Sequence, residues 1–177
     1  GIIVGTIFLV KGYQSGNFWA VFGIWLYLFG MLGSYVSSTL YHALKYHNPW
    51  KKRLRNWDHA AIYWHIAGSY SPVTLIALRN EVWLCAIIGT IVSFRKMEEH
   101  SNVETICFIV MGLSVLVAFK PLYAIAEGTC YWMIAEGVCY ITGAVFYSFR
   151  QRYMHSVFHF FVLAGSACHI VAVWLIL

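Results

Sequence analysis

Long apolar runs separated by short polar segments recur along the whole chain. Because a helix needs about 20 mostly apolar residues to cross a bilayer, this pattern predicts an all-α, polytopic membrane protein. The run at 82–94 falls short of that length and spans only with tilt or local thinning, and the run at 1–10 reads as a first helix missing its start. The seven predicted spans are residues 1–10, 18–44, 58–78, 82–94, 103–119, 129–148 and 155–177.

Composition supports the same fold class. Of the 177 residues, 60% are hydrophobic and only 11% are charged, which is too little polar surface to cover a soluble domain of this size. One domain over residues 1–177 accounts for the whole pattern. Pro72, which follows the stretch from Gly68 to Ser71, is expected to kink or locally unwind the third span.

Basic residues in the short loops predict the orientation. Lys and Arg concentrate in cytoplasmic loops, and alternate loops here carry nine against three of them. The chain therefore has its N-terminus in the cytoplasm and its C-terminus outside. Loop positions also explain the net charge of +5 better than nucleic-acid binding does. The nine are Lys45, Lys51, Lys52, Arg53, Arg55, Arg95, Lys96, Arg150 and Arg152, and the three are Lys11, Arg79 and Lys120.

Polar side chains collect at one depth under this topology. The second span ends with Ser38 and His42, one helical turn apart on one face, and the third begins with Asp58. The last span begins with His155 and His159, again one turn apart. All five residues are predicted to share one layer near the cytoplasmic face.

This set indicates a zinc site. Three neutral imidazoles that leave one position open are the ligand set of a catalytic zinc, so we predict His42, His155 and His159 as ligands. Asp58 then hydrogen-bonds the metal-bound water or orients a ligand, and Ser38 contacts water or substrate. The alternative is that the five are separate interfacial polar groups, which span ends commonly carry.

Other polar residues inside the spans receive structural interpretations. His169 lies ten residues after His159, about 15 Å along a helix, so it cannot share that ion and is expected to be a hydrogen-bonded packing residue. Glu136, inside the sixth span, is expected to be protonated and hydrogen-bonded to Tyr or Ser, although an intramembrane acid is also a functional candidate. His65 is expected to be a packing or cavity residue. The five cysteines have no C-x-x-C spacing and read as small buried hydrophobes.

Three motifs in order resemble the hemolysin III and PAQR (progestin and adipoQ receptor) family, whose wider superfamily includes alkaline ceramidases. They are S-T-L-Y-H ending at His42, D-H-A-A-I-Y beginning at Asp58, and H-S-V-F-H-F-F-V-L-A-G-S-A-C-H beginning at His155. The resemblance implies seven helices with the N-terminus inside and zinc on the three histidines. The motifs look most like the bacterial branch, which implies the inner membrane. A Glu and Asn motif usual near the family's first helix has no match here.

Three functions follow from the resemblance and the open ligand position. The first is a zinc-dependent hydrolase of lipid amide or ester bonds, with a membrane lipid as substrate. The second is a pore-forming cytolysin or channel, although no span shows a sustained polar stripe. The third is a receptor-like protein in which zinc only ties helices together. Substrate identity, catalysis and oligomeric state stay undetermined by the sequence.

Overall fold

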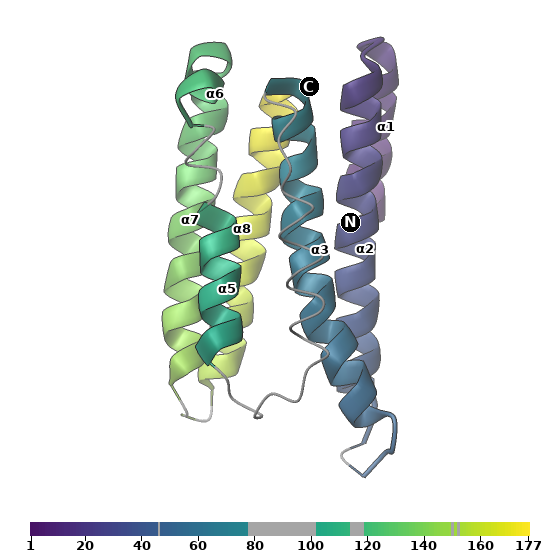
Figure 1. The fold of residues 1–177 in the computed structure, drawn as a ribbon, viewed down its shortest axis with the longest axis vertical. Coiled ribbons are helices and arrows are strands. Elements are labelled where there is room, and N and C mark those ends of the chain that lie inside the picture. Colours follow the sequence, from purple (N-terminus) through teal and green to yellow (C-terminus); the bar gives the residue numbers. More distant parts are fainter. Residues whose placement is uncertain (46, 78–101, 114–118, 150, 152) are drawn as a thin grey trace. The chain divides into compact units, whose positions relative to one another are not determined.

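Helices joined by turns and short irregular segments make up the described part of the chain. The computed structural model covers residues 1–177 and describes all of them except 46, 78–101, 114–118, 150 and 152 (Figure 1). The chain divides into two compact units, residues 1–111 and 112–177. The all-α prediction is confirmed over the described residues. Their helices are α1 (Ile2–Gln14), α2 (Phe18–Ala43), α3 (Lys51–Ala77), α5 (Asn102–Leu113), α6 (Phe119–Ile125), α7 (Glu127–Ser148) and α8 (Met154–Ile176).

In the first unit, a tight turn reverses the chain between α1 and α2. Gly16 sits in this turn with φ 66°, a left-handed conformation that glycine adopts without strain. The next residue caps α2, because the Asn17 side-chain oxygen accepts a 3.0 Å hydrogen bond from the Trp19 backbone N–H. Gly5 and Gly12 of α1 then pack against the side chains of Leu28 and Ile24.

Glycines bring α2 and α3 into close antiparallel contact. A Cβ added to Gly30 would lie 2.2 Å from the Trp64 carbonyl oxygen, and one added to Gly68 would lie 2.5 Å from the Leu26 carbonyl oxygen. Small residues at such points let two backbones approach, as is common between membrane helices. These contacts fix the register of α3 against α2.

The third helix differs from its predicted span in two ways. It begins at Lys51 and not at residue 58, because the helix continues through polar residues that hydropathy alone excludes. Its helical assignment is also unbroken through Pro72, so the expected local unwinding is not found there, while a kink at this proline stays a prediction. The hydroxyls of Ser71 and Thr74, on either side of the proline, donate to the carbonyls of Ala67 and Tyr70 one turn earlier, at 2.7 and 2.9 Å.

Two other predicted spans are not fully described by the structure. The span at 82–94 lies outside the described residues. Within the span at 103–119, α5 ends at Leu113 and α6 begins at Phe119, while 114–118 lie outside the described residues. The seven-span count and the orientation of the termini therefore stay predictions.

In the second unit, α7 and α8 pack as an antiparallel pair, visible as the light green and yellow ribbons in Figure 1. Gly143 lies against Phe161, since a Cβ added there would stand 3.1 Å from the Phe161 Cβ. Near the opposite end of the pair, the Thr129 hydroxyl donates a 3.3 Å hydrogen bond to the Ala172 carbonyl. Both contacts belong to one antiparallel register.

Two of the described helices are long and apolar enough to cross a membrane. They are Phe18–Ala43 and, within α8, Ser156–Ile176. Large apolar side chains also face outward on α8, where Phe160 is 69% and Leu163 is 63% exposed. Such exposure suits contact with lipid tails, so the coarser prediction of a membrane protein is supported.

Candidate metal centre

The end of α2 carries two of the predicted site residues. Ser38 is half-buried, and His42, one turn further along, is exposed in the last turn before the helix stops at Ala43. The Lys51 ammonium secures this end, because it donates hydrogen bonds to the carbonyls of Tyr41 and Leu44, the latter at 2.9 Å. It also lies 4.2 Å from the centre of the Tyr41 ring.

Lys51 has a role that the sequence analysis missed. Charge patterning explains this lysine as a topology signal only, whereas its side chain satisfies carbonyls at the C-terminus of α2, where a cation also complements the helix dipole. The sequence feature that could have indicated this role is a lysine a few residues after the end of a predicted helix. Lys51 therefore holds the turn that carries His42.

Asp58 lies in the first half of α3 and is half-buried. The α2–α3 register sets its depth, because Gly30 faces Trp64 and the two helices run antiparallel. Counting from that contact, Ser38 is level with Asn56, only two residues from Asp58, or about 3 Å along the axis. His42 lies one turn nearer the loop. Ser38 and Asp58 thus share one level of the first unit.

Two further histidines on α3 have local partners. The ring of His59 makes a 2.9 Å hydrogen bond through Nδ1 to the Arg55 carbonyl one turn earlier, which requires a proton on Nδ1. The ring of His65 packs edge-on against Tyr35, with 5.8 Å between ring centres. This aromatic contact agrees with the packing role predicted for His65.

The remaining predicted ligands lie at the start of α8. His159 is exposed in the second turn, and its ring is 5.1 Å from that of Phe158. His155 belongs to the first turn, and its side chain lies outside the described part of the chain. The i, i+4 spacing of the pair on one continuous helix is as predicted.

The predicted ligand set is divided between the two units. Ser38, His42 and Asp58 belong to residues 1–111, and His155 and His159 to residues 112–177. Among the side chains that the structure describes, no three His, Cys, Asp or Glu residues are grouped closely enough to hold a metal ion. The zinc site therefore stays a prediction.

A buried acid and base join α7 to α8. Glu136 Oε2 and His169 Nδ1 are 2.8 Å apart, and each side chain is only 2% exposed. The hydrogen-bonded packing role expected for His169 is confirmed. The partner of Glu136 is this histidine, not the Tyr or Ser that we expected. Sequence periodicity could have suggested the pair only if the α7–α8 register had been known.

The cysteines described as free do not enter the site. They are Cys130, which is buried, and Cys139 and Cys168, which are half-buried. This agrees with the prediction of small apolar packing residues.

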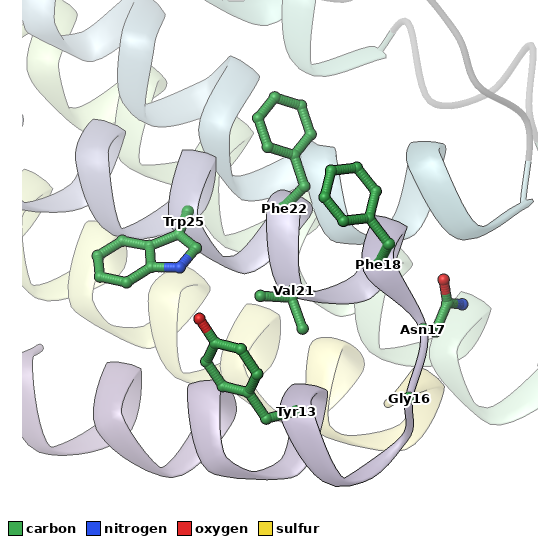
Figure 2. Close-up of a pocket in the computed structure, with 7 residues that line it drawn as sticks. All are labelled: Tyr13, Gly16, Asn17, Phe18, Val21, Phe22 and Trp25. Carbon is green, nitrogen blue, oxygen red and sulfur yellow. The ribbon is translucent and has the colours of Figure 1, made fainter.

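A hollow of about 400 Å³ opens at the turn between α1 and α2 (Figure 2). Aromatic side chains dominate its walls, and it contains none of the predicted site residues. It has no carboxylate, imidazole or thiol, so it offers no group for acid, base or metal chemistry. Its lining is Tyr13, Gly16, Asn17, Phe18, Val21, Phe22 and Trp25.

Comparison with known proteins extends over almost the whole chain. The family described as Haemolysin-III related matches residues 1–170. No solved structure matches the chain at a significant level.

Individual relatives come from bacteria and from animals. The chain is 34% identical over 171 residues to "Hemolysin-3" of Bacillus cereus, covering 91% of this chain and 78% of the relative. It is 33% identical over 162 residues to "Hemolysin-3 homolog" of Bacillus subtilis, covering 86% and 76%. It is 29% identical over 193 residues to "Monocyte to macrophage differentiation factor" of Homo sapiens, covering 97% and 76%.

Proposed function

Because the chain belongs to the haemolysin-III related family, we propose that it is a zinc-dependent hydrolase of lipid amide or ester bonds in a bacterial inner membrane. Its site lies near the cytoplasmic face. The observation that carries the proposal is the α2–α3 register, which brings Ser38 and Asp58 to one level close to the end of α2 that bears His42. A carboxylate, a hydroxyl and an imidazole near one helix end are the groups that such a hydrolase needs.

The donor set suits zinc. His42, His155 and His159 would supply three imidazole nitrogens from two helices, and zinc accepts such nitrogens at about 2.0 to 2.1 Å. Three protein ligands leave one tetrahedral position open, as in catalytic sites and unlike closed structural ones. Lys51 supports the ligand-bearing turn of α2 without competing for the metal, because its ammonium is committed to two carbonyls.

The protein groups then have distinct tasks. Zinc, when bound, polarises a carbonyl and lowers the pKa of a water molecule towards neutrality. Asp58 accepts the proton that this water loses and later returns it to the leaving amine or alcohol. Ser38, on the same level, donates a hydrogen bond that holds the water or the carbonyl oxygen in place.

A lipid is the substrate that suits this position best. Apolar side chains such as Phe160 and Leu163 on α8 are exposed, and they allow acyl tails to stay in the bilayer while a headgroup linkage reaches the helix ends. The excess of Lys and Arg between the predicted spans beside these ends supports the cytoplasmic side and a multi-pass topology.

Hydrolysis by purified protein tests the proposal. We expect release of fatty acid from a ceramide or a phospholipid, and we expect His155→Ala to abolish both turnover and bound zinc. His47→Ala, in the loop between α2 and α3, is the matched control and should leave both intact. Turnover that is unchanged in His155→Ala would contradict the proposal.

A pore is the second candidate function, favoured by the name of the relative "Hemolysin-3" of Bacillus cereus. Dye release from liposomes discriminates between the two. A hydrolase leaves intact vesicles sealed before lipid is consumed, whereas a pore releases dye at once and continues after zinc is chelated.

A receptor-like protein with a structural zinc is the third candidate. In that case a protein group would fill the fourth position, and chelation would lower the melting temperature without removing any turnover. Loss of turnover on chelation, with recovery when zinc is returned, favours the hydrolase.

A further inference from the structure

The Glu136–His169 pair lies outside the proposed site. The hydrogen bond between Oε2 and Nδ1 is 2.8 Å long, and both side chains are almost fully buried. His169 lies ten residues from His159 on the same helix, about 15 Å along its axis. Neither side chain therefore takes part in the proposed hydrolysis.

A pair of this kind is specific for one helix register. Glu136 and His169 each satisfy the other's buried hydrogen-bonding group. If the helices slid, each polar group would be buried without its partner, which is costly in apolar surroundings. A single buried polar contact fixes register in coiled coils for the same reason.

The rest of the α7–α8 interface discriminates less between registers. Two further polar contacts between these helices are longer, at 3.3 Å between Thr129 and the Ala172 carbonyl and 3.3 Å between Tyr140 and Ser166. Its other close contacts are apolar: Gly143 lies against Phe161, and aromatic rings pack in the pairs Phe146–Phe161 and Tyr147–Phe158. Lipid competes equally with such apolar contacts, so they favour close approach more than one register.

We propose that Glu136 and His169 are positioning residues that set the register of α8 against α7 and thereby place His155 and His159 for zinc binding. This inference rests on the proposed function. Because α8 is one continuous helix from Met154 to Ile176, a shift at His169 reaches its first turns undiminished. A slip of one turn moves a ligand by about 5.4 Å, whereas zinc tolerates about 0.2 Å.

Register is measured first, without zinc. Cysteines replace Gly143 and Phe161 in full-length protein whose native cysteines are alanine, and disulfide formation between α7 and α8 is followed under mild oxidant. A Cβ at residue 143 lies 3.1 Å from that of Phe161, so cross-linking is expected to be nearly complete. The native cysteines are Cys85, Cys107, Cys130, Cys139 and Cys168.

Three variants of the pair then distinguish a change of helix register from a general loss of stability. Glu136→Leu removes the acid and should lower cross-linking severalfold. Exchanging the partners, with Glu136→His and His169→Glu together, should restore it, because the exchanged side chains can form the same hydrogen bond. Glu136→Gln keeps an acceptor for the imidazole N–H and should behave almost as the parent does, even if the leucine variant does not fold.

Zinc affinity is the second readout, measured on the same variants with their native cysteines restored and residues 143 and 161 unchanged. Glu136→Leu should weaken zinc binding by about tenfold, as loss of groups that orient ligands commonly does, and the exchanged pair should recover it. Tyr140→Phe removes the neighbouring contact with Ser166 and is the matched control, expected to bind zinc normally.

The outcomes are distinguishable. Unchanged cross-linking and zinc affinity in Glu136→Leu would overturn the positioning role and leave the proposed function standing. No zinc in the parent protein would overturn the proposed function, and the positioning of ligands with it. Failure of the exchanged pair to restore cross-linking while Glu136→Gln remains native would also contradict the inference.

Discussion

Gly30 of α2 and Trp64 of α3 meet backbone to backbone. A Cβ on Gly30 would stand 2.2 Å from the Trp64 carbonyl oxygen and 2.8 Å from its carbonyl carbon. Because these are main-chain atoms of a helix, they cannot rotate away as a side chain can. This contact sets the α2–α3 register from which the common level of Ser38 and Asp58 follows.

Substitution of Gly30 tests that contact. Gly30→Ala should force the helices apart and lower the free energy of unfolding by about 1 to 3 kcal/mol, as overpacking in a close-packed interior does. Thermal unfolding in detergent measures the change. Gly33→Ala on the same helix is the control, because a Cβ there meets only the Trp64 ring at 3.8 Å, an ordinary contact. Equal stability of the two variants would contradict the register.

A second prediction concerns Lys51, whose ammonium donates to the Tyr41 and Leu44 carbonyls. Lys51→Met keeps the apolar stem and removes the charge, so it should destabilise the end of α2 by about 1 kcal/mol and weaken zinc binding at His42. The melting temperature and zinc affinity are the readouts. Lys52→Met, at the exposed neighbouring position, should change neither. Equal melting temperatures and zinc affinities in the two variants would contradict the capping role of Lys51.

The third prediction is that the stability of the junction between the spans predicted at 103–119 and 129–148 depends on pH. The hydroxyls of Tyr123 and Tyr131 donate to the same Glu127 carboxylate oxygen, at 2.8 and 2.9 Å, and they hold the pKa of Glu127 below its usual value. The contact therefore stabilises this junction fully above the usual carboxyl pKa and is lost as pH falls through the lowered pKa. NMR titration of the Glu127 carboxyl carbon measures the midpoint.

Tyrosine substitutions supply the controls for that titration. Tyr123→Phe removes the larger cause of the lowered pKa and should move the Glu127 midpoint up towards its usual value, with a smaller move for Tyr131→Phe. The pKa of Tyr123 itself is raised by its hydrogen-bonded neighbours Tyr131 and Glu127, so this tyrosine should resist ionisation in base. A Glu127 midpoint at or above the ordinary carboxyl value would contradict the geometry.

Topology gives the fourth prediction. One set of segments between the predicted spans carries nine Lys and Arg residues and the other carries three. A fluorescent reporter at the N-terminus should therefore fluoresce, and alkaline phosphatase at the C-terminus should be active. Reporters in the loop between α2 and α3 should behave as the N-terminal one does. The reverse pattern would put the candidate site on the outer side and exclude a cytoplasmic-leaflet substrate.

The sequence predicted helices well because a long apolar run has few alternatives in a membrane. Their ends were harder, as α3 illustrates: it starts at Lys51, where a polar turn is helical although it is not apolar. Hydropathy reports where lipid begins, whereas hydrogen bonding decides where a helix begins. Contacts between helices, such as that of Glu136 with His169, depend on how the two helices are aligned. The periodicity of residues along a single helix does not report this alignment.

For the site, spacing gave the pairs on single helices, because residues one turn apart share a face. It could not give the distances between helices, and the ligands on α2 and α8 belong to units that are described separately. The level shared by Ser38 and Asp58 became evident only from the glycine contacts of Gly30 and Gly68.

The X-ray absorption spectrum of zinc in purified protein tests the central claim most directly, because it reports the ligands of the metal itself. We expect one zinc per chain, with three imidazole nitrogens and one oxygen at about 2.0 to 2.1 Å, and loss of the bound zinc in His159→Ala as in His155→Ala. Absence of stoichiometric zinc, or a spectrum with sulfur ligands that is unchanged in His159→Ala, would contradict the account.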